Sequence, residues 1–175
     1  MRTGLARRGR ARFDPGMAVL MELTRIFIRE MTDMQIIELS EVDGERSFPI
    51  VIGLPEAFAI ERRLKDIAIA RPQTHDLLAS CIRDLGGKLR EIVIHDLEKG
   101  IYFAKLVIEQ GGRTVEIDSR PSDAIAIGVA ESVPIYVAEH VLAEAAQSPL
   151  DDDARLDDAL GEESDAEEDD GPSGW

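Results

Sequence analysis

The residues with the clearest capacity for chemistry lie at positions 118–123, where the sequence DSRPSD joins an alternating strand pattern to an apolar helical pattern. Pro121 suits the first turn of a helix and Asp123 suits the positive end of a helix dipole, so a helix start alone explains both. Asp118 and Arg120 go beyond that need. Because residues two apart in an extended segment project to the same side, they can share a pocket in which the arginine binds an anion and the carboxylate binds a metal ion or acts as a base. The alternative is an internal ion pair that fastens the corner.

A second polar segment, RPQTHD at residues 71–76, also precedes an apolar helical pattern. His75 and Asp76 would be about 100° apart on a helix, so both can approach one substrate, but they would not face each other as a dyad. The alternative is that Asp76 only complements the helix dipole and that His75 lies at the surface. His95 and Asp96 form a similar pair within a strand pattern, where neighbouring side chains point to opposite faces, so we do not expect them to act together.

The chain contains an internal repeat that includes the first of these segments. Leu39 recurs as Leu106, 67 residues later, and the sequence EAFAI at residues 56–60 recurs as DAIAI at residues 123–127. An ungapped run that ends in a shared pattern of acid, Ala, apolar residue, Ala and Ile favours duplication over chance similarity between strand-rich segments.

Each half is predicted to contain three strands followed by a helix. This order predicts an α+β fold in a single domain, with duplicated halves that form largely antiparallel or mixed sheets against which helices pack, rather than a doubly wound parallel sheet. The predicted strands of the first half lie near 20–30, 33–41 and 46–52, with a helix at about 55–69. Those of the second half lie near 88–97, 101–110 and 113–118, with a helix at about 121–132. A helix that starts near residue 74, a strand at 134–137 and a last helix at 139–146 complete the domain.

Helical periodicity also predicts which side chains of the first two helices are buried. In the first helix the exposed residues should be Arg62, Arg63, Lys65 and Asp66, and the buried residues should be Ala57, Ile60, Leu64, Ile67 and Ala68. In the second helix, which the Gly86-Gly87 pair ends, Thr74 is the predicted N-cap and the predicted buried stripe consists of Leu77, Leu78, Cys81, Ile82 and Leu85. Cys81, the single cysteine, is therefore expected to be a small buried hydrophobe rather than a nucleophile.

Composition divides the 175 residues into one domain and two tails. Residues 1–16 are predicted to be a disordered basic leader, residues 17–146 the folded domain, and residues 147–175 a disordered acidic tail. No apolar run approaches the roughly 20 residues that a membrane helix needs, and the leader lacks the apolar core of a secretory signal, so we expect a cytoplasmic protein. The net charge of −15 and an aromatic content of 5% argue against nucleic-acid binding through overall charge or base stacking.

Several segments together resemble the bifunctional nuclease domain family, first catalogued as a domain of unknown function, over about residues 20–146. They are MEL at 21–23, GLPEA at 53–57, RPQTHDL at 71–77, DSRPSDAIA at 118–126 and PIYV at 134–137. The resemblance implies a compact α+β domain that self-associates, and a nuclease activity like that of the plant members against RNA and DNA. It also implies a Leu or Ala residue where this chain has Gly128.

We therefore predict a nuclease, a hydrolase that acts on the phosphodiester bonds of RNA, DNA or both and that forms a homo-oligomer. Such hydrolysis needs an activated water and stabilisation of the charge on the phosphorane, and carboxylates that hold Mg²⁺ or Mn²⁺ supply both. A bound divalent ion would also let an acidic surface accept nucleic acid. The predicted catalytic residues are His75 for proton transfer and Asp118 and Asp123 as metal ligands, and the predicted substrate-binding residues are Arg71, Arg120 and Ser122.

The alternative hypothesis is a non-catalytic interaction or regulatory module, whose duplicated halves form a ligand-binding or dimer surface around residues 118–123. The negative charge, the few aromatic residues and the absence of a known metal-binding motif from the sequence favour this hypothesis. A third hypothesis is a hydrolase that acts on small nucleotides rather than on polymers.

Overall fold

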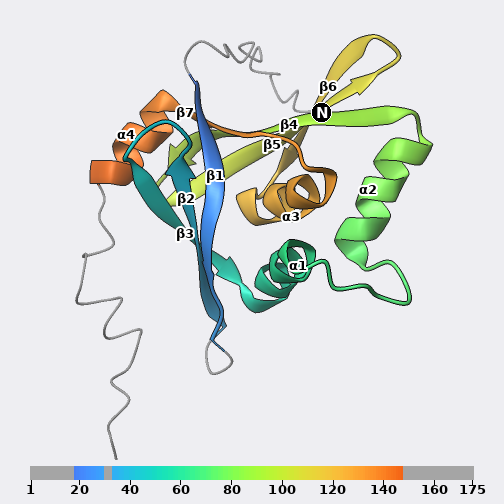
Figure 1. Cartoon of the computed structure of the whole chain (residues 1–175). Helices are drawn as coiled ribbons and strands as arrows, with labels where there is room; N and C mark the ends of the chain where they lie inside the picture. The colour runs from blue at the N-terminus through green and yellow to red at the C-terminus, as the bar shows by residue number, and fades with distance from the viewer. Residues whose placement is uncertain (1–17, 30–32, 148–175) are drawn as a thin grey trace, which may run out of the picture.

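The computed structural model describes residues 18–29 and 33–147, which form one mixed sheet of seven strands with four helices (Figure 1). The predicted α+β fold is thereby confirmed, whereas the predicted leader at 1–16 and the predicted tail from residue 148 onward lie outside the described residues. The strands are β1 (Ala18–Phe27), β2 (Met34–Glu41), β3 (Ser47–Gly53), β4 (Gly87–Glu98), β5 (Ile101–Gln110), β6 (Arg113–Ser119) and β7 (Ile135–Ala138). The helices are α1 (Leu54–Leu64), α2 (Thr74–Asp84), α3 (Pro121–Glu131) and α4 (Glu139–Gln147).

The two predicted halves are visible in the strand order β3-β2-β1-β7-β4-β5-β6. In each half three consecutive strands pair antiparallel as neighbours, and a helix follows the third strand. β7 joins the halves, because it pairs antiparallel with β1 and parallel with β4. The sequence match between the halves does not extend to the strand register. In the second half Leu106 of β5 lies opposite Ile117 of β6. In the first half Ile50, the counterpart of Ile117, lies opposite Ile37 rather than opposite Leu39, the counterpart of Leu106.

The sheet curves strongly, so that the edge strand β3 approaches β5, the strand next to the other edge. Phe48 of β3 stacks on Tyr102 of β5 with ring centroids 5.5 Å apart, although β2, β1, β7 and β4 separate these two strands in the sheet. α1 and α3 lie side by side within this curve, α2 packs on α3 and β4, and α4 packs on β3, β4 and β7 (Figure 1). The curvature therefore brings the starts of α1, α2 and α3 into one region.

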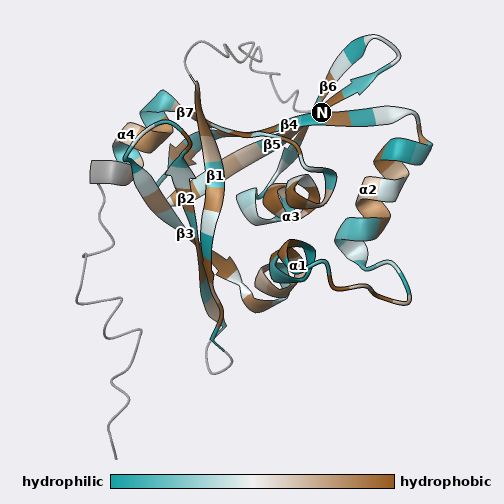
Figure 2. Cartoon of the chain, in the orientation of Figure 1, coloured by the Kyte–Doolittle hydropathy of each residue, from teal (hydrophilic) through white to brown (hydrophobic). Residues whose placement is uncertain are grey.

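α3 is the central helix of the core. Its sequence is apolar around most of its circumference (Figure 2), and its buried residues are Pro121, Ser122 and the run from Ala124 to Gly128. Gly128 lets α3 approach β4 closely, because a Cβ atom there would lie 2.0 Å from Cδ1 and 3.1 Å from Cγ1 of the fully buried Ile92. Neither α3 nor any other helix of the described residues is long and apolar enough to cross a membrane.

α1 ends at Leu64 rather than near residue 69, and it buries the predicted residues Ala57 and Ile60 but not the predicted residues that follow them. Leu64 and Ile67, which were predicted to be buried, are 48% and 51% exposed. Arg62 and Arg63, which were predicted to be exposed, have only 11% and 30% of their side chains exposed, because both pair with Asp76 of α2. The predicted exposure was therefore wrong for Arg62 and Arg63, whereas Lys65 and Asp66 are exposed as predicted.

α2 also presents a different side to the core. Its N-cap is Gln73 rather than Thr74, and Gln73 and Asp76 form a capping box. The buried residues of α2 are Asp76 and Ala79. A buried carboxylate needs charged partners, and Asp76 finds them in the arginines of α1, so the side of α2 with small and polar residues faces inward. The predicted buried stripe is mostly at the surface instead: Ile82 is partly buried, and the exposed members are Leu77, Leu78, Cys81 and Leu85.

We predict that Gly128→Ala destabilises the protein by about 1 kcal/mol, because the new methyl group overpacks against Ile92 by more than the helix gains from losing a glycine. Ile92→Val, which removes the Cδ1 atom, should by itself destabilise the protein by about 1 kcal/mol. In the Ile92→Val background, Gly128→Ala should therefore destabilise the protein much less. Urea unfolding of the four proteins measures this cycle, and equal destabilisation by Gly128→Ala in both backgrounds would contradict the close approach.

Candidate functional site

The first turns of α2 and α3 bring His75 and Asp123 into contact. Nε2 of His75 lies 3.1 Å from Oδ1 of Asp123, although the two residues are 48 positions apart in the sequence. The contact follows from the packing of α2 on α3, which places the two first turns beside each other. Two of the residues that were predicted for one site thus lie together.

Arg120 links this pair to the other half of the chain. It is the N-cap of α3, where Nε and Nη2 donate to Oδ2 and Oδ1 of Asp123 at 2.8 and 3.0 Å, and Nη2 also donates to Oε1 of Glu56 at 2.6 Å. Glu56 is the third residue of α1, as Asp123 is the third residue of α3. Gly53, the N-cap of α1, leaves room for this carboxylate, because a Cβ atom there would lie 2.4 Å from Oε2 of Glu56. We call His75, Asp123, Arg120 and Glu56 the Asp123 cluster.

The charges of the Asp123 cluster determine which nitrogen of His75 carries the proton. Burial by itself would raise the pKa of Asp123, but hydrogen bonds from Arg120 and His75 hold this pKa below its usual value. The bonds to Asp123 and then to Glu56 raise the pKa of Arg120. Asp123 is therefore an ionised acceptor at neutral pH, so Nε2 of His75 donates to it, and in the neutral form of the ring Nδ1 keeps a lone pair. A carboxylate that orients an imidazole in this way prepares it as a general base.

A cavity of about 410 Å³ opens beside Arg120. Arg120, Pro121 and Ser122 line it on the side of the Asp123 cluster, and Tyr102 contributes an aromatic ring. The rest of its wall is mostly apolar and comes from β3, the β4–β5 hairpin and α4, namely Pro49, Ile50, Val51, Ile52, Gly53, Leu97, Gly100, Ile101 and Ala145. A guanidinium beside an apolar, partly aromatic wall suits an anionic ligand that carries a ring, such as a nucleotide unit.

The remaining predicted site residues lie apart from the Asp123 cluster. Asp118 is exposed on β6 opposite Lys105, and no hydrogen bond or ion pair within residues 18–29 and 33–147 joins it to the cluster. Arg71 is exposed in the segment before α2. Ser122 is buried, and the buried hydroxyl of Ser119 has no hydrogen-bond partner in the described part of the chain. The roles predicted for Asp118, Arg71 and Ser122 stay predictions.

The Asp123 cluster in this arrangement does not fit a divalent cation. Both oxygens of Asp123 accept hydrogen bonds from Arg120 or His75, and Glu56 shares the same guanidinium. A metal ion would compete with Arg120 for these oxygens, which are the ligands that Mg²⁺ and Mn²⁺ prefer. Among the residues that the structure describes, no three His, Cys, Asp or Glu side chains are grouped so that they could hold a metal ion. The ion predicted at Asp118 and Asp123 stays a prediction.

Glu56 is the member of the Asp123 cluster that was not selected from the sequence. Its recurrence as Asp123 in the second half indicates duplication, and the helix dipole explains an acid in the first turn without any partner. The sequence does contain a signal for Glu56. The N-cap position is Gly53 in the first half and Arg120 in the second, so a single cation is available to the equivalent acids Glu56 and Asp123.

We predict that Arg120→Gln raises the pKa of Asp123, because burial then acts on a carboxyl group that has lost its strongest donor. The pKa of Asp123 lies below its usual 3.8 in the folded protein, so its ionised form stabilises the fold above that pH, and this stabilisation is lost as the pH falls through the folded value. The variant should therefore lose more stability at pH 6 than at pH 3. Carbon-13 NMR titration of the carboxyl group and urea unfolding measure the two effects. An unchanged pKa in the variant would contradict the bridging role of Arg120.

Comparison with known proteins identifies the family of this chain. The bifunctional nuclease domain matches residues 37–149 of the chain. An uncharacterized protein of Mycobacterium tuberculosis strain H37Rv is 39% identical over 120 residues, which cover 69% of this chain and 71% of that protein. Bifunctional nuclease 1 of Oryza sativa subsp. japonica is 25% identical over 118 residues, 65% of this chain and 36% of the rice protein. Bifunctional nuclease 2 of Arabidopsis thaliana is 28% identical over 96 residues, 53% of this chain and 29% of the plant protein. With a match to more than half of its length, the chain belongs to the bifunctional nuclease domain family.

Proposed function

We propose that this protein is a nuclease that cleaves phosphodiester bonds of RNA, DNA or both. The observation that carries the proposal is the contact of His75 with the ionised carboxylate of Asp123, which is bonded in turn to Arg120, a lining residue of the cavity. Membership of the family and the names of the plant relatives support this class of substrate. The arrangement offers a base for the attacking oxygen and a cation for the charge that develops on the phosphate.

Each member of the Asp123 cluster has its own role in this proposal. Nδ1 of His75 takes the proton from the attacking oxygen, while Asp123 holds the ring and stabilises the imidazolium that forms. Nη1 of Arg120 makes no hydrogen bond within the described residues, so this side of the guanidinium contacts the phosphate. Arg71, exposed four residues before His75, contacts the same phosphate or the next one.

The attacking oxygen differs between the two substrates. In RNA the neighbouring 2′-hydroxyl attacks, its bond to phosphorus forms as the bond to the 5′-oxygen breaks, and a 2′,3′-cyclic phosphate results. The 5′-oxygen takes a proton from water and leaves as a hydroxyl group, and the imidazolium of His75 returns its proton to the solvent. In DNA a water molecule has to attack. Because a hydroxyl that is already in place avoids the entropic cost of positioning water, this scheme should cleave RNA faster than DNA. No step of the scheme uses the divalent ion predicted at Asp118 and Asp123.

We predict that His75→Gln lowers the rate of RNA cleavage by about 10²–10⁴-fold, because it removes the base. Asp123→Asn should lower the rate by about 10-fold or more, because the ring stays but loses its orientation. The rates are measured on a fluorescent single-stranded RNA with extensively purified full-length protein. His140→Gln is the matched control, because His140 is exposed and its nearest acid is Asp96, at 3.7 Å, so this variant should keep the wild-type rate.

Two results would count against this scheme. Equal rates for the wild type and His75→Gln would indicate a contaminating nuclease or another site. Cleavage that stops in EDTA, returns with Mg²⁺ or Mn²⁺ and is absent from Asp118→Asn would replace the side-chain scheme with the metal-dependent reaction that the sequence predicted.

The outward side of α2 favours a second candidate function, an interaction surface between copies of this chain. Leu77, Leu78 and Leu85 are 57%, 43% and 75% exposed, and with the exposed Cys81 they lie on one side of the helix. Adjoining exposed leucines on a folded domain mark a surface that another protein covers. We propose that two copies pack together through this side of α2, which would form the predicted homo-oligomer.

We predict that Leu77→Glu combined with Leu85→Glu converts the oligomer into monomers, because the paired surface would then bury carboxylates. Size-exclusion chromatography with light scattering measures the mass. Val42→Glu, which changes an exposed apolar residue in the β2–β3 connection, is the control and should leave the mass unchanged. A monomeric wild type, or a double variant with the wild-type mass, would be incompatible with this interface.

A further inference from the structure

A cavity of about 310 Å³ lies between α1, α2 and the segment that connects them, next to the first turn of α2. Three arginines line it, Arg62 and Arg63 from α1 and Arg83 from α2, and the acids in its wall are Asp76 and Glu131. We call this cavity the arginine pocket. The arginine pocket is positively charged, whereas the chain as a whole has a formal net charge of −15.

One buried carboxylate serves two of these arginines. Asp76 is 8% exposed, Nη2 of Arg62 donates to its two oxygens at 2.9 and 3.0 Å, and Arg63 pairs with Oδ1. The backbone N–H of Gln73 donates to Oδ2 at 2.8 Å. A carboxylate accepts about four hydrogen bonds, so Asp76 has no capacity left for the other donors of the two guanidinium groups.

Arg62 and Arg63 keep unmet donors and an excess of positive charge. The Nε atoms of both are buried without a hydrogen-bond partner among the described residues. Burial, followed by the charge of Arg62, lowers the pKa of Arg63, as expected for a guanidinium whose charge is incompletely compensated. Two arginines that share the single charge of Asp76 leave one positive charge over, which a second anion would compensate.

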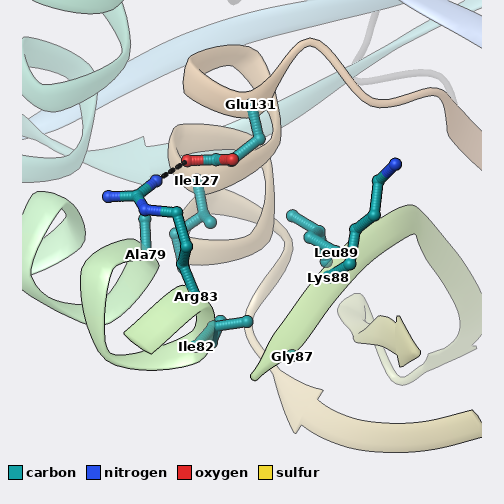
Figure 3. A pocket seen from close by; sticks show the side chains of 8 residues that line it. All are labelled: Ala79, Ile82, Arg83, Gly87, Lys88, Leu89, Ile127 and Glu131. Atoms are coloured by element: carbon teal, nitrogen blue, oxygen red, sulfur yellow. Dashed lines mark hydrogen bonds and ion pairs between the residues drawn. The ribbon is translucent and has the colours of Figure 1, made fainter. Parts of the chain in front are cut away.

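Arg83 adds a third guanidinium at the boundary with a neighbouring cavity of about 340 Å³. Figure 3 shows its side chain reaching from α2 toward Glu131 of α3. This ion pair is 3.3 Å long and 61% of the Arg83 side chain is exposed, so the pair is weakly held. Arg83 can therefore turn toward an anion in the arginine pocket at little cost.

We infer that the arginine pocket binds a phosphate group. Guanidinium groups form paired, charge-assisted hydrogen bonds with phosphate oxygens, and the pocket has room for a phosphate and part of the molecule that carries it. The acidic chain as a whole repels anions, so binding would depend on this local group of arginines. His75 and Asp76 are consecutive in α2, so a nucleic acid that is held here and extends past the first turn of α2 would also reach the Asp123 cluster. The inference concerns binding alone and does not depend on cleavage.

Calorimetric titration of the full-length protein with sodium phosphate, at an ionic strength kept constant with sodium chloride, tests the inference. Arg63→Gln should weaken phosphate binding by about 10-fold or more. Arg90→Gln is the matched control, because it removes the same charge from an exposed pair with Glu109, and it should change the affinity by less than about 2-fold. Asp76→Asn should tighten binding, because it frees both arginines from a competing carboxylate. If Arg63→Gln does not fold, Arg83→Gln at the exposed rim should still weaken binding several-fold.

Two further probes identify the source of the phosphate. Adenosine 5′-monophosphate binding more tightly than inorganic phosphate, with the gain lost in Arg63→Gln, would point to a free nucleotide. Tighter binding of a single-stranded oligonucleotide without terminal phosphates, lost in the same variant, would point to the polymer backbone. The absence of saturable phosphate binding by the wild type, or equal weakening by Arg63→Gln and Arg90→Gln, would overturn the inference whether or not the protein cleaves RNA.

Discussion

The guanidinium of Arg120 holds together the parts of the molecule on which the proposed chemistry depends. Glu56 and Asp123 occupy equivalent positions in the two halves, and without a cation between them their carboxylates would repel each other where α1 and α3 meet. Arg120 compensates this repulsion and keeps Asp123 ionised, so Asp123 can orient His75. Because the Arg120 side chain is 65% exposed, its ion pairs add little to the free energy of unfolding. Their effect is on the geometry of the site.

The helices that carry the site are attached to the core in two different ways. α3 is positioned by packing, since it is buried on most sides and Gly128 sets its approach to β4. α2 is positioned by Ala79 and Ile82, which pack on the core, and also by polar contacts of its first turn, through Asp76 to the arginines of α1 and through His75 to Asp123. Hydrophobic periodicity predicted the wrong face of α2 for this reason. Periodicity counts apolar residues, but it does not show that a buried carboxylate will draw arginines inward and leave the leucines outside.

The order of the elements was predictable from alternation, turn signals and the internal repeat, because each depends on local sequence. The members of the site were partly predictable, since residue type and position at helix starts selected His75, Arg120 and Asp123. Their arrangement was not, because it depends on how α1, α2 and α3 pack. Asp118 was selected because a helix start does not require it, whereas Glu56 and Asp123, the acids that the two halves share, both bond to Arg120. In this duplicated fold, equivalent positions come close together, so a shared residue can belong to the site.

The pairing of His75 with an ionised Asp123 is tested most directly by nitrogen-15 NMR of the histidine rings at pH 9, where the imidazole of free histidine is neutral. We predict that His75 carries its proton on Nε2, with Nδ1 showing the chemical shift of an unprotonated ring nitrogen, and that Asp123→Asn changes the proportion of the two tautomers. A proton on Nδ1 in the wild-type protein, or a spectrum of His75 that Asp123→Asn leaves unchanged, would contradict this pairing.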